Sequence, residues 1–391
     1  MAKPFQFAAI PRIYFGHGRL SLLPALIREY GDSFILVTGE SSFMDSSGGK
    51  SLINGIHEAG IGFEHIGIPS EPSPEIIDNA VRTLGTKGFN VLVAVGGGSV
   101  IDSGKAISAM MYMNEPVTDF LEGVGTKVHP GTKIPCIAVP TTSGTGSEAT
   151  KNAVISRTGN NGFKKSLRHD NFVPDIALVD PGLTVSCPPE ITAASGMDCF
   201  TQLAEAYLSD KSSEYTDALA TEAFKEIKSS LLKAFIDGSD IEARSGMSFA
   251  ALTSGICLAN AGLGVVHGFA SSIGGMYSIP HGVICGTLMA KANEVSVRKL
   301  RMKQDGHRAL KKYALLGKIF VRGRRANDDY YIDGFISYLH DLTNELYIPG
   351  LKESGVREDS LERICELTEC KNNPVKLDRS DLMEIVSERF V

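Results

Sequence analysis

The first half of the chain alternates short apolar runs with longer segments of mixed apolar and polar residues. Runs of this length that carry almost no polar residue are typical of strands buried on both faces. Four runs have this character: 33–38, 90–95, 134–139 and 176–179. Between them lie three segments with a helical pattern: 51–59, 75–84 and 101–113. Strands that alternate with helices predict a parallel sheet covered on both faces.

The pattern changes near residue 185. Pro188-Pro189-Glu190 has the character of a helix start, because proline loses no hydrogen bond in the first turn of a helix. Seven later segments have helical patterns: 190–208, 215–235, 241–260, 284–297, 334–346, 361–369 and 381–389. We therefore predict an α/β domain over residues 1–185 and an all-helical domain over residues 186–391.

One stretch, 245–266, carries no charged residue and is long enough to cross a bilayer. It is rich in Ser, Thr, Asn and Gly, and it runs directly into His267. A buried helix of a soluble core explains this composition better than a membrane span.

Charge and cysteine usage narrow the class of protein further. The chain of 391 residues has a net charge of −6 and no run of Lys and Arg, which argues against a nucleic-acid-binding surface. Its seven cysteines form no CxxC pair, as expected of buried thiols in a reducing compartment. The first 15 residues lack the apolar core of a signal peptide. We expect a cytoplasmic protein.

A glycine-rich loop is the sharpest local motif. Gly96-Gly97-Gly98-Ser99 follows an apolar run and opens a helical segment that includes Asp102. Glycines let the backbone approach a ligand closely, and the start of a helix attracts phosphate. The spacing is neither that of a Walker loop nor GxGxxG, and a tight turn without a ligand stays open as an alternative.

A second loop, 140–150, also follows an apolar run. It places five hydroxyl side chains and two glycines between Thr141 and Glu148. In a doubly wound sheet both loops would lie at the carboxyl ends of strands, where ligands bind. Hydroxyls there can donate to ribose and phosphate oxygens. Together the two loops suit a dinucleotide, although a polar loop that only caps a helix would have a similar sequence.

The helical half contains candidate metal ligands. Asp198 and Gln202 are four residues apart, so that a helix would place both on one face. His267 ends the uncharged stretch, and His281 follows in Pro280-His281-Gly282. A carboxylate and two imidazoles suit Fe(II) or Zn(II). Each residue also has an ordinary structural explanation, and sequence spacing alone does not bring Asp198 to His267.

These motifs together resemble the iron-containing alcohol dehydrogenase family. The resemblance covers essentially the whole chain and follows the family's order of motifs. It rests on these segments: PRIYFG from Pro11, GGGSVIDSGK, PTTSGTGSEAT, VDP at Val179, SGMD at Ser195, GLGVVHG at Gly262, PHG at Pro280, and the late Asn373-Pro374. Several such motifs in order are far more specific than any one of them.

The resemblance implies a Rossmann-like dinucleotide domain followed by a helical metal domain, as in dehydroquinate synthase, with the site in the cleft between. The resemblance implies that these residues contact the cofactor: Gly97, Gly98, Ser99, Thr141, Thr142, Thr145, Ser147 and Lys164. We add Asp102, from the glycine-rich motif, and Gly39, which follows the first apolar run. Three metal ligands map onto Asp198, His267 and His281, which are also the implied catalytic residues.

Two positions depart from the family's pattern. Gln202 stands where the usual member has a fourth ligand, a histidine, so it is a weak ligand, a residue that supports the ligands, or neither. Ser271 stands where many members carry a histidine thought to relay protons, which leaves bound water or a ribose hydroxyl for that role.

The expected reaction is hydride transfer between NAD(P) and a small alcohol or aldehyde, with the metal as a Lewis acid on the substrate oxygen. Gly39 and the two serines after Glu40 would admit the 2′-phosphate of NADP, whereas Glu40 could repel it; on balance we slightly favour NADP over NAD. Fe(II) is the expected metal, with Zn(II) as the alternative, and a homodimer is the family-level expectation. Three competing interpretations are a metal-free reductase like maleylacetate reductase, a dehydroquinate-synthase-like lyase, and a nucleotide-binding pseudoenzyme.

Overall fold

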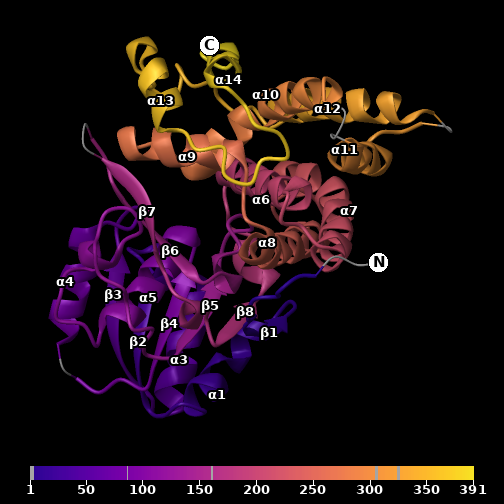
Figure 1. Ribbon diagram of the computed structural model, residues 1–391. Helices are drawn as coiled ribbons and strands as arrows, with labels where there is room; N and C mark the ends of the chain where they lie inside the picture. Colours follow the sequence, from indigo (N-terminus) through magenta and orange to yellow (C-terminus); the bar gives the residue numbers. More distant parts are fainter. Residues whose placement is uncertain (1–3, 86, 160–161, 304–306, 324–325) are drawn as a thin grey trace. The chain divides into compact units, whose positions relative to one another are not determined.

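The computed structural model describes residues 4–391 except 86, 160–161, 304–306 and 324–325. The chain forms two compact units: residues 8–157 with 164–187, and residues 188–391 with 1–7 and 158–163. The first unit holds a parallel sheet and the second is helical (Figure 1), so the predicted fold class is confirmed.

The α/β unit is built on a six-stranded parallel sheet with the order β1-β8-β5-β4-β2-β3. The strands of this sheet are β1 (Arg12–Phe15), β2 (Ser33–Gly39), β3 (Gly62–Ile68), β4 (Val91–Gly96), β5 (Cys136–Pro140) and β8 (Ile176–Val179). The helices of the unit are α1 (Leu23–Arg28), α2 (Ser42–Asp45), α3 (Ser47–Glu58), α4 (Pro74–Leu84) and α5 (Gly98–Met110). A separate two-stranded sheet pairs β6 (Asn152–Arg157) with β7 (Phe163–Arg168).

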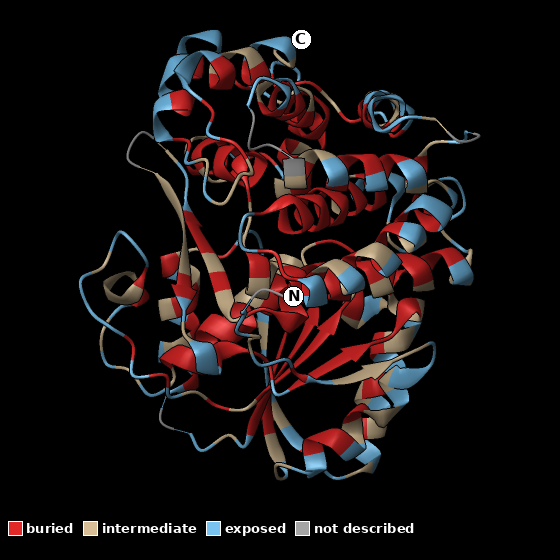
Figure 2. Cartoon of the chain, turned by 45° about the vertical axis from the view of Figure 1, so that its right-hand side comes forward, coloured by how far each residue is buried: buried red, intermediate tan, exposed pale blue. Residues whose placement is uncertain are grey.

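The four predicted strands are the central ones, β2, β4, β5 and β8. All six residues of β4 and all five of β5 are buried, which explains their continuous apolar sequences. Figure 2 shows these strands in red. The edge strands β1 and β3 were not predicted, because they are partly exposed and their sequences mix polar with apolar residues.

The helical unit contains nine described α-helices, and every predicted one is present. They are α6 (Pro189–Leu208), α7 (Glu214–Ile236), α8 (Ile241–Ala261), α9 (Val265–Met276), α10 (His281–Arg301), α11 (His307–Phe320), α12 (Asp328–Glu345), α13 (Leu361–Leu367) and α14 (Arg379–Glu388). Their core includes a cluster of aromatic rings formed by Phe200, Phe224, Phe320 and Phe335.

Two boundaries in this unit differ from the prediction, and both matter for the site. The uncharged stretch is broken at Gly262, whose φ of 70° favours glycine, and His267 lies on a separate helix, α9. The pattern also starts α10 at residue 284, whereas the helix begins at His281, directly after Pro280. Proline fixes its own φ and precedes helices readily, so Pro280 and not the apolar periodicity marks this start.

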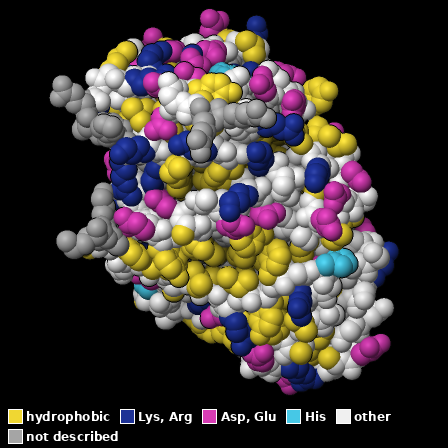
Figure 3. Space-filling view, turned by 90° about the vertical axis from the view of Figure 1, so that its right-hand side faces the viewer, with side chains coloured by type: hydrophobic (Ala, Val, Ile, Leu, Met, Phe, Trp, Pro, Cys, Tyr) yellow, Lys and Arg dark blue, Asp and Glu magenta, His cyan; other side chains and the backbone are white. Residues whose placement is uncertain are grey.

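No single described helix is long and apolar enough to cross a membrane; one pair, α8 with α9, passes a length and composition test together but is bent by 98°. On the face shown in Figure 3, acidic and basic side chains are intermixed. Many surface charges are paired, such as Arg298 with Glu384 at 2.6 Å.

Candidate functional site

The two predicted loops leave the sheet side by side. β4 ends at Gly96 and β5 ends at Pro140, and these two residues are partners in the register of the parallel strands. The N–H of Thr141 donates to the carbonyl of Gly96 at 3.0 Å. β2, the other neighbour of β4, ends at Gly39 on the same edge. Three of the expected cofactor segments therefore share the carboxyl edge of the α/β unit, as the sequence predicted.

The loops approach each other so closely that a side chain on Gly98 would collide with a threonine and one on Gly97 would touch another. A Cβ on Gly98 would lie 2.7 Å from Cγ2 of Thr145, and one on Gly97 would lie 3.4 Å from Oγ1 of Thr142. α5 begins here, with Gly97 as its N-cap and no side chain capping it. The first N–H groups of a helix have no partner within the helix, so this start can bind a phosphate.

Asp102 and Ser147, both expected to contact the cofactor, hold the two loops together. The hydroxyl of Ser147 donates to Oδ1 of Asp102, and Oδ2 of Asp102 accepts from the N–H of Val154 at 2.9 Å. The buried amine of Lys105 lies 3.0 Å from Asp102 Oδ1 and donates to the carbonyl of Ser147 at 2.9 Å. Lys105 was not predicted as a site residue, although it stands i+3 from Asp102 on the same helix.

Ser99 and Lys164 meet at a residue that the sequence analysis also missed. The hydroxyl of Ser99 donates to Oε1 of Glu71 at 2.9 Å, and the amine of Lys164 lies 3.2 Å from Oε2. Glu71 is half-exposed and lies between β3 and α4. Nothing in its sequence context distinguishes it from other surface acids, so only the fold could identify it.

In the helical unit, three residues that are far apart in sequence come together. Asp198 lies on α6, His267 on α9 and His281 on α10. Oδ1 of Asp198 is 3.5 Å from Nε2 of His267 and 3.7 Å from Nε2 of His281. Asp198 and His267 are buried, while the His281 side chain is 25% exposed, so the group is reached from the side of His281.

Close packing of α10 on α6 makes this approach possible. A Cβ on Gly282 would lie 2.2 Å from the carbonyl oxygen of Ala194, one turn before Asp198. Only glycine fits at this contact, since any other residue would push the helices apart. The glycine after His281 therefore positions that histidine against Asp198.

Glu205 contacts His267 through the ring nitrogen Nδ1, which is not the one that faces Asp198. Its Oε2 lies 2.8 Å from Nδ1 of His267 and accepts from the N–H of Gly264 at 2.9 Å, while Oε1 accepts from the N–H of Val266 at 2.6 Å. The carboxylate thus caps the start of α9 and orients the imidazole. Asp198, Gln202 and Glu205 follow i, i+4, i+7 on α6, and this spacing is a signal that the sequence analysis did not use.

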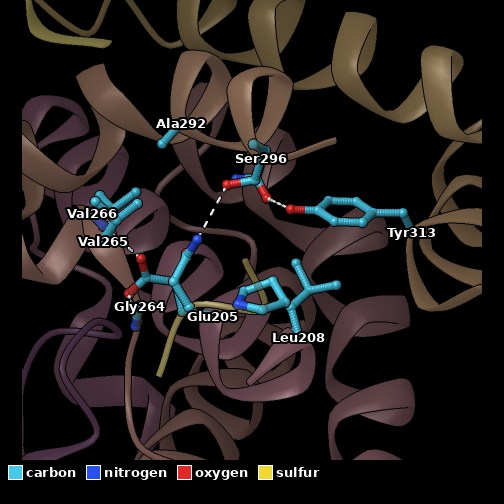
Figure 4. A pocket seen from close by; sticks show the side chains of 11 residues that line it. Glu205, Leu208, Gly264, Val265, Val266, Ala292, Ser296 and Tyr313 are labelled. Atoms are coloured by element: carbon cyan, nitrogen blue, oxygen red, sulfur yellow. Dashed lines mark hydrogen bonds between the residues drawn. The ribbon is translucent and has the colours of Figure 1, made fainter. Parts of the chain in front are cut away.

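A small cavity adjoins Glu205 (Figure 4). Its lining residues include Glu205, Gly264, Asn293, Ser296 and Tyr313. The hydroxyl of Tyr313 donates to Oδ1 of Asn293 at 2.8 Å. These polar groups give the buried carboxylate a polar surrounding.

In this group the neighbouring imidazoles favour the ionised form of Asp198, and the neighbouring acids favour the protonated form of His267. Burial alone would raise the pKa of Asp198, but His281 and His267 outweigh it and the pKa lies below its usual value. Burial would lower the pKa of His267, but Cys285, Asp198 and Glu205 outweigh it and hold that pKa well above its usual value. The negative charge of Asp198 and the positive charge of His267 are therefore each stabilised by the charged groups beside them.

Asp198 Oδ1 has no hydrogen-bond partner among the residues that the structure describes, although it is fully buried. Such an oxygen is costly unless something else binds it. A tetrahedral ion with ordinary bond lengths would place its oxygen and nitrogen ligands about 3.4 Å apart. The observed distances of 3.5 and 3.7 Å fit this spacing. The residues therefore fit a divalent metal ion.

The thiol of Cys285 belongs to the same cluster. Its Sγ lies 3.9 Å from Nε2 of His267 and 3.8 Å from Nε2 of His281, and the ligand atoms of all four residues lie within 4.8 Å of one another. Burial raises the pKa of this thiol to about 11. Cys285 was predicted only as a structural thiol, because the predicted helix began at residue 284, after His281.

Gln202 and Ser271, the two residues that depart from the family pattern, each make a hydrogen bond within the helical unit. Gln202 is buried, and its amide nitrogen donates to the hydroxyl of Ser254 at 2.8 Å. The hydroxyl of Ser271 donates to the carbonyl of His267 at 2.9 Å, one turn earlier on α9.

Comparison with known proteins agrees with this geometry. Residues 11–181 match the family model of iron-containing alcohol dehydrogenases, and residues 192–390 match the model of that family's C-terminal domain. The chain belongs to the iron-containing alcohol dehydrogenase family.

Relatives span the full chain. It is 30% identical to alcohol dehydrogenase 4 of Saccharomyces cerevisiae (strain YJM789), with all of both chains covered. It is also 30% identical to the NADPH-dependent butanol dehydrogenase of Clostridium saccharobutylicum, with 96% of each covered. Among solved structures, an archaeal halo-thermophilic alcohol dehydrogenase from a Red Sea brine pool has a TM-score of 0.90 at 26% identity, covering 100% of this chain and 99% of that one.

Proposed function

We propose that this protein is a metal-dependent alcohol dehydrogenase that transfers a hydride between NAD(P) and a small alcohol or aldehyde. The observation that carries the proposal is the buried Oδ1 of Asp198, which has no hydrogen-bond partner in the described part of the chain and lies near the Nε2 atoms of two histidines. In the oxidative direction the alcohol carbon gives a hydride to the nicotinamide and the hydroxyl proton is released. The products are a carbonyl compound and NAD(P)H.

Asp198, His267 and His281 would hold a divalent ion. When bound, such an ion polarises the substrate oxygen as a Lewis acid and lowers the cost of removing the hydroxyl proton. The chain's own residues prepare this site. Glu205 accepts the Nδ1 proton of His267, so that Nε2, on the side of Asp198, is the ring nitrogen that would bind the ion. Burial keeps bulk water away from the carboxylate of Asp198.

For the cofactor, we propose that the start of α5 at Gly97, Gly98 and Ser99 binds the pyrophosphate. The remaining residues proposed to contact the cofactor are Gly39, Asp102, Thr141, Thr142, Thr145, Ser147 and Lys164. Of these, Asp102 and Ser147 act chiefly by fixing the loops, since they bond to each other.

We propose NADP as the preferred cofactor, because β2 ends in Gly39 where an acidic residue would repel a 2′-phosphate. A side chain fits at Gly39, since its Cβ would meet only Ser42 Oγ, at 3.8 Å. Gly39→Asp should lower kcat/KM for NADPH at least about tenfold, equivalent to about 1.4 kcal/mol of repulsion, and spare NADH. Gly39→Asn is the neutral control of equal size. An unchanged NADPH preference in Gly39→Asp would refute this assignment.

We further propose that the protein works in the cytoplasm as a homodimer. None of the seven cysteines, all of which lie in the described part of the chain, forms a disulfide, which suits a reducing compartment. The dimer rests on family membership alone. Light scattering of the purified protein tests it, and a monomer mass would refute it.

The test of the activity is removal and return of the metal. We expect a chelator to abolish alcohol oxidation, followed as NAD(P)H absorbance, and Fe(II) or Zn(II) to restore it. The double variant His267→Ala/His281→Ala should bind no metal and recover no activity. The variant His57→Ala, outside the cluster, is the control and should behave as wild type. Full activity after metal removal would refute the mechanism and favour a metal-free reductase.

A further inference from the structure

The donor cluster around Asp198 contains a sulfur atom that the mechanism has not used. Cys285 is fully buried, and its Sγ lies 3.9 and 3.8 Å from the Nε2 atoms of His267 and His281. These are long distances for a hydrogen bond to sulfur. In a tetrahedral site with a metal–sulfur bond of about 2.3 Å, sulfur and nitrogen ligands stand about 3.5 Å apart. A contraction of a few tenths of an ångström would bring all three atoms onto one ion.

The start of α10 explains why the thiol is there. His281 is the first residue of the helix, so Cys285 lies one turn later on the same face. Gly282 and Gly286 flank the cysteine and let α10 pack against Ala194 and Met197 of α6. The same packing that brings His281 to Asp198 therefore also brings Cys285 to it.

Gln202 is the less suitable fourth ligand. The hydroxyl of Ser254 donates its one proton to the carbonyl of Ala251 at 2.8 Å, so it must accept from Gln202. This contact occupies the amide nitrogen of Gln202, so only its amide oxygen could bind a metal. An amide oxygen is also a weaker ligand for a borderline-soft ion than a thiolate.

We propose that Cys285 is the fourth protein ligand of the metal, in a set with Asp198, His267 and His281. The inference rests on the proposed function, because it assumes that an ion binds at Asp198. On binding, the thiol loses its proton to solvent and the thiolate sulfur joins the ion, with no change of oxidation state. A thiolate in place of a fourth nitrogen or oxygen ligand shifts the preference of the site from Fe(II) towards Zn(II).

Cobalt(II) substitution tests the ligand directly, without an activity measurement. The metal-free protein should bind one Co(II), with visible bands of a tetrahedral ion and an intense near-ultraviolet band from thiolate-to-cobalt charge transfer. Cys285→Ser should lose the near-ultraviolet band, keep the visible bands, and bind Zn(II) at least about tenfold more weakly. Gln202→Ala should keep the near-ultraviolet band.

Cys257→Ala is the matched control, since Cys257 is a buried thiol on α8 that donates to the carbonyl of Thr216 at 3.6 Å, apart from the cluster. It should retain both sets of bands. X-ray absorption of the wild-type zinc protein, which needs no variant, should show one sulfur ligand at about 2.3 Å.

Three outcomes overturn the proposal. If wild type binds one Co(II) without the near-ultraviolet band, or if Cys285→Ser keeps that band, Cys285 is not a ligand and the metal-dependent function stands. If wild type binds no Co(II) or Zn(II) at all, the proposed function fails together with the inference.

Discussion

Nδ1 of His267 lies 2.8 Å from Oε2 of Glu205, and both side chains are buried in the helical unit. The same carboxylate accepts two backbone N–H groups at the start of α9, from Gly264 and Val266. It is therefore held ionised, and the pKa of Glu205 lies below its usual value because His267 and these N–H groups outweigh burial. One acid fixes the helix that carries the histidine and also the direction in which the ring points.

Glu205→Gln should lower the affinity for Zn(II) by about 10- to 100-fold. An amide has one acceptor oxygen where the carboxylate has two, so it cannot accept from Gly264, Val266 and His267 together. The measurement is competition with a chromogenic chelator. Glu222→Gln, at an exposed i,i+3 pair with Lys225, is the control and should bind as wild type. Equal affinity in the two variants would show that Glu205 only caps the helix.

Gly98→Ala should destabilise the α/β unit by about 1–3 kcal/mol and weaken NADPH binding, because the new methyl group would displace Thr145. Thr145→Ala should restore stability in the double variant, since it removes the two atoms at 2.7 and 2.8 Å. Urea unfolding and the fluorescence of bound NADPH measure the two effects. Gly88→Ala, where a methyl group meets nothing within 4 Å, is the control. A double variant as unstable as Gly98→Ala would disprove this contact.

Glu148 should make stability depend on pH. Burial raises its pKa to about 7, against opposing effects of the backbone and Lys105. Because the folded pKa exceeds the unfolded value of 4.5, the stabilisation is complete below pH 4.5 and is lost as the pH rises through 7. The total loss is about 3 kcal/mol.

Glu148→Gln removes this titration, so its free energy of unfolding should increase relative to wild type between pH 5 and pH 8. Urea unfolding of both proteins at these two pH values measures the difference. A constant difference would mean that Glu148 is ionised in the folded protein throughout this range.

The features that the sequence predicted correctly are those that depend on the local pattern of apolar and polar residues. The strands β2, β4, β5 and β8 are continuous apolar runs because both of their faces are covered, and the loops after β4 and β5 follow from the parallel order. The edge strand β3 was missed because alternate exposure gives it a mixed sequence.

The site was harder to predict because it depends on helix boundaries and on packing between helices. His267, His281 and Asp198 were candidate ligands by residue type, and the resemblance joined them into one set; their approach to 3.5 and 3.7 Å depends on how α9 and α10 pack on α6. Cys285 was missed because the apolar pattern starts α10 three residues late, which hides its i+4 relation to His281. Glu205 acts through a contact with a residue 62 positions away.

The central claim is that one ion binds among Asp198, His267 and His281. Anomalous X-ray diffraction from crystals grown with Zn(II), recorded above and below the zinc edge, tests it most directly. The account predicts one strong peak within about 2.5 Å of Oδ1 of Asp198 and of both Nε2 atoms. A peak only at Glu294, His340 and Glu388, the other described cluster that could hold a metal ion, or no peak at Asp198, would contradict it.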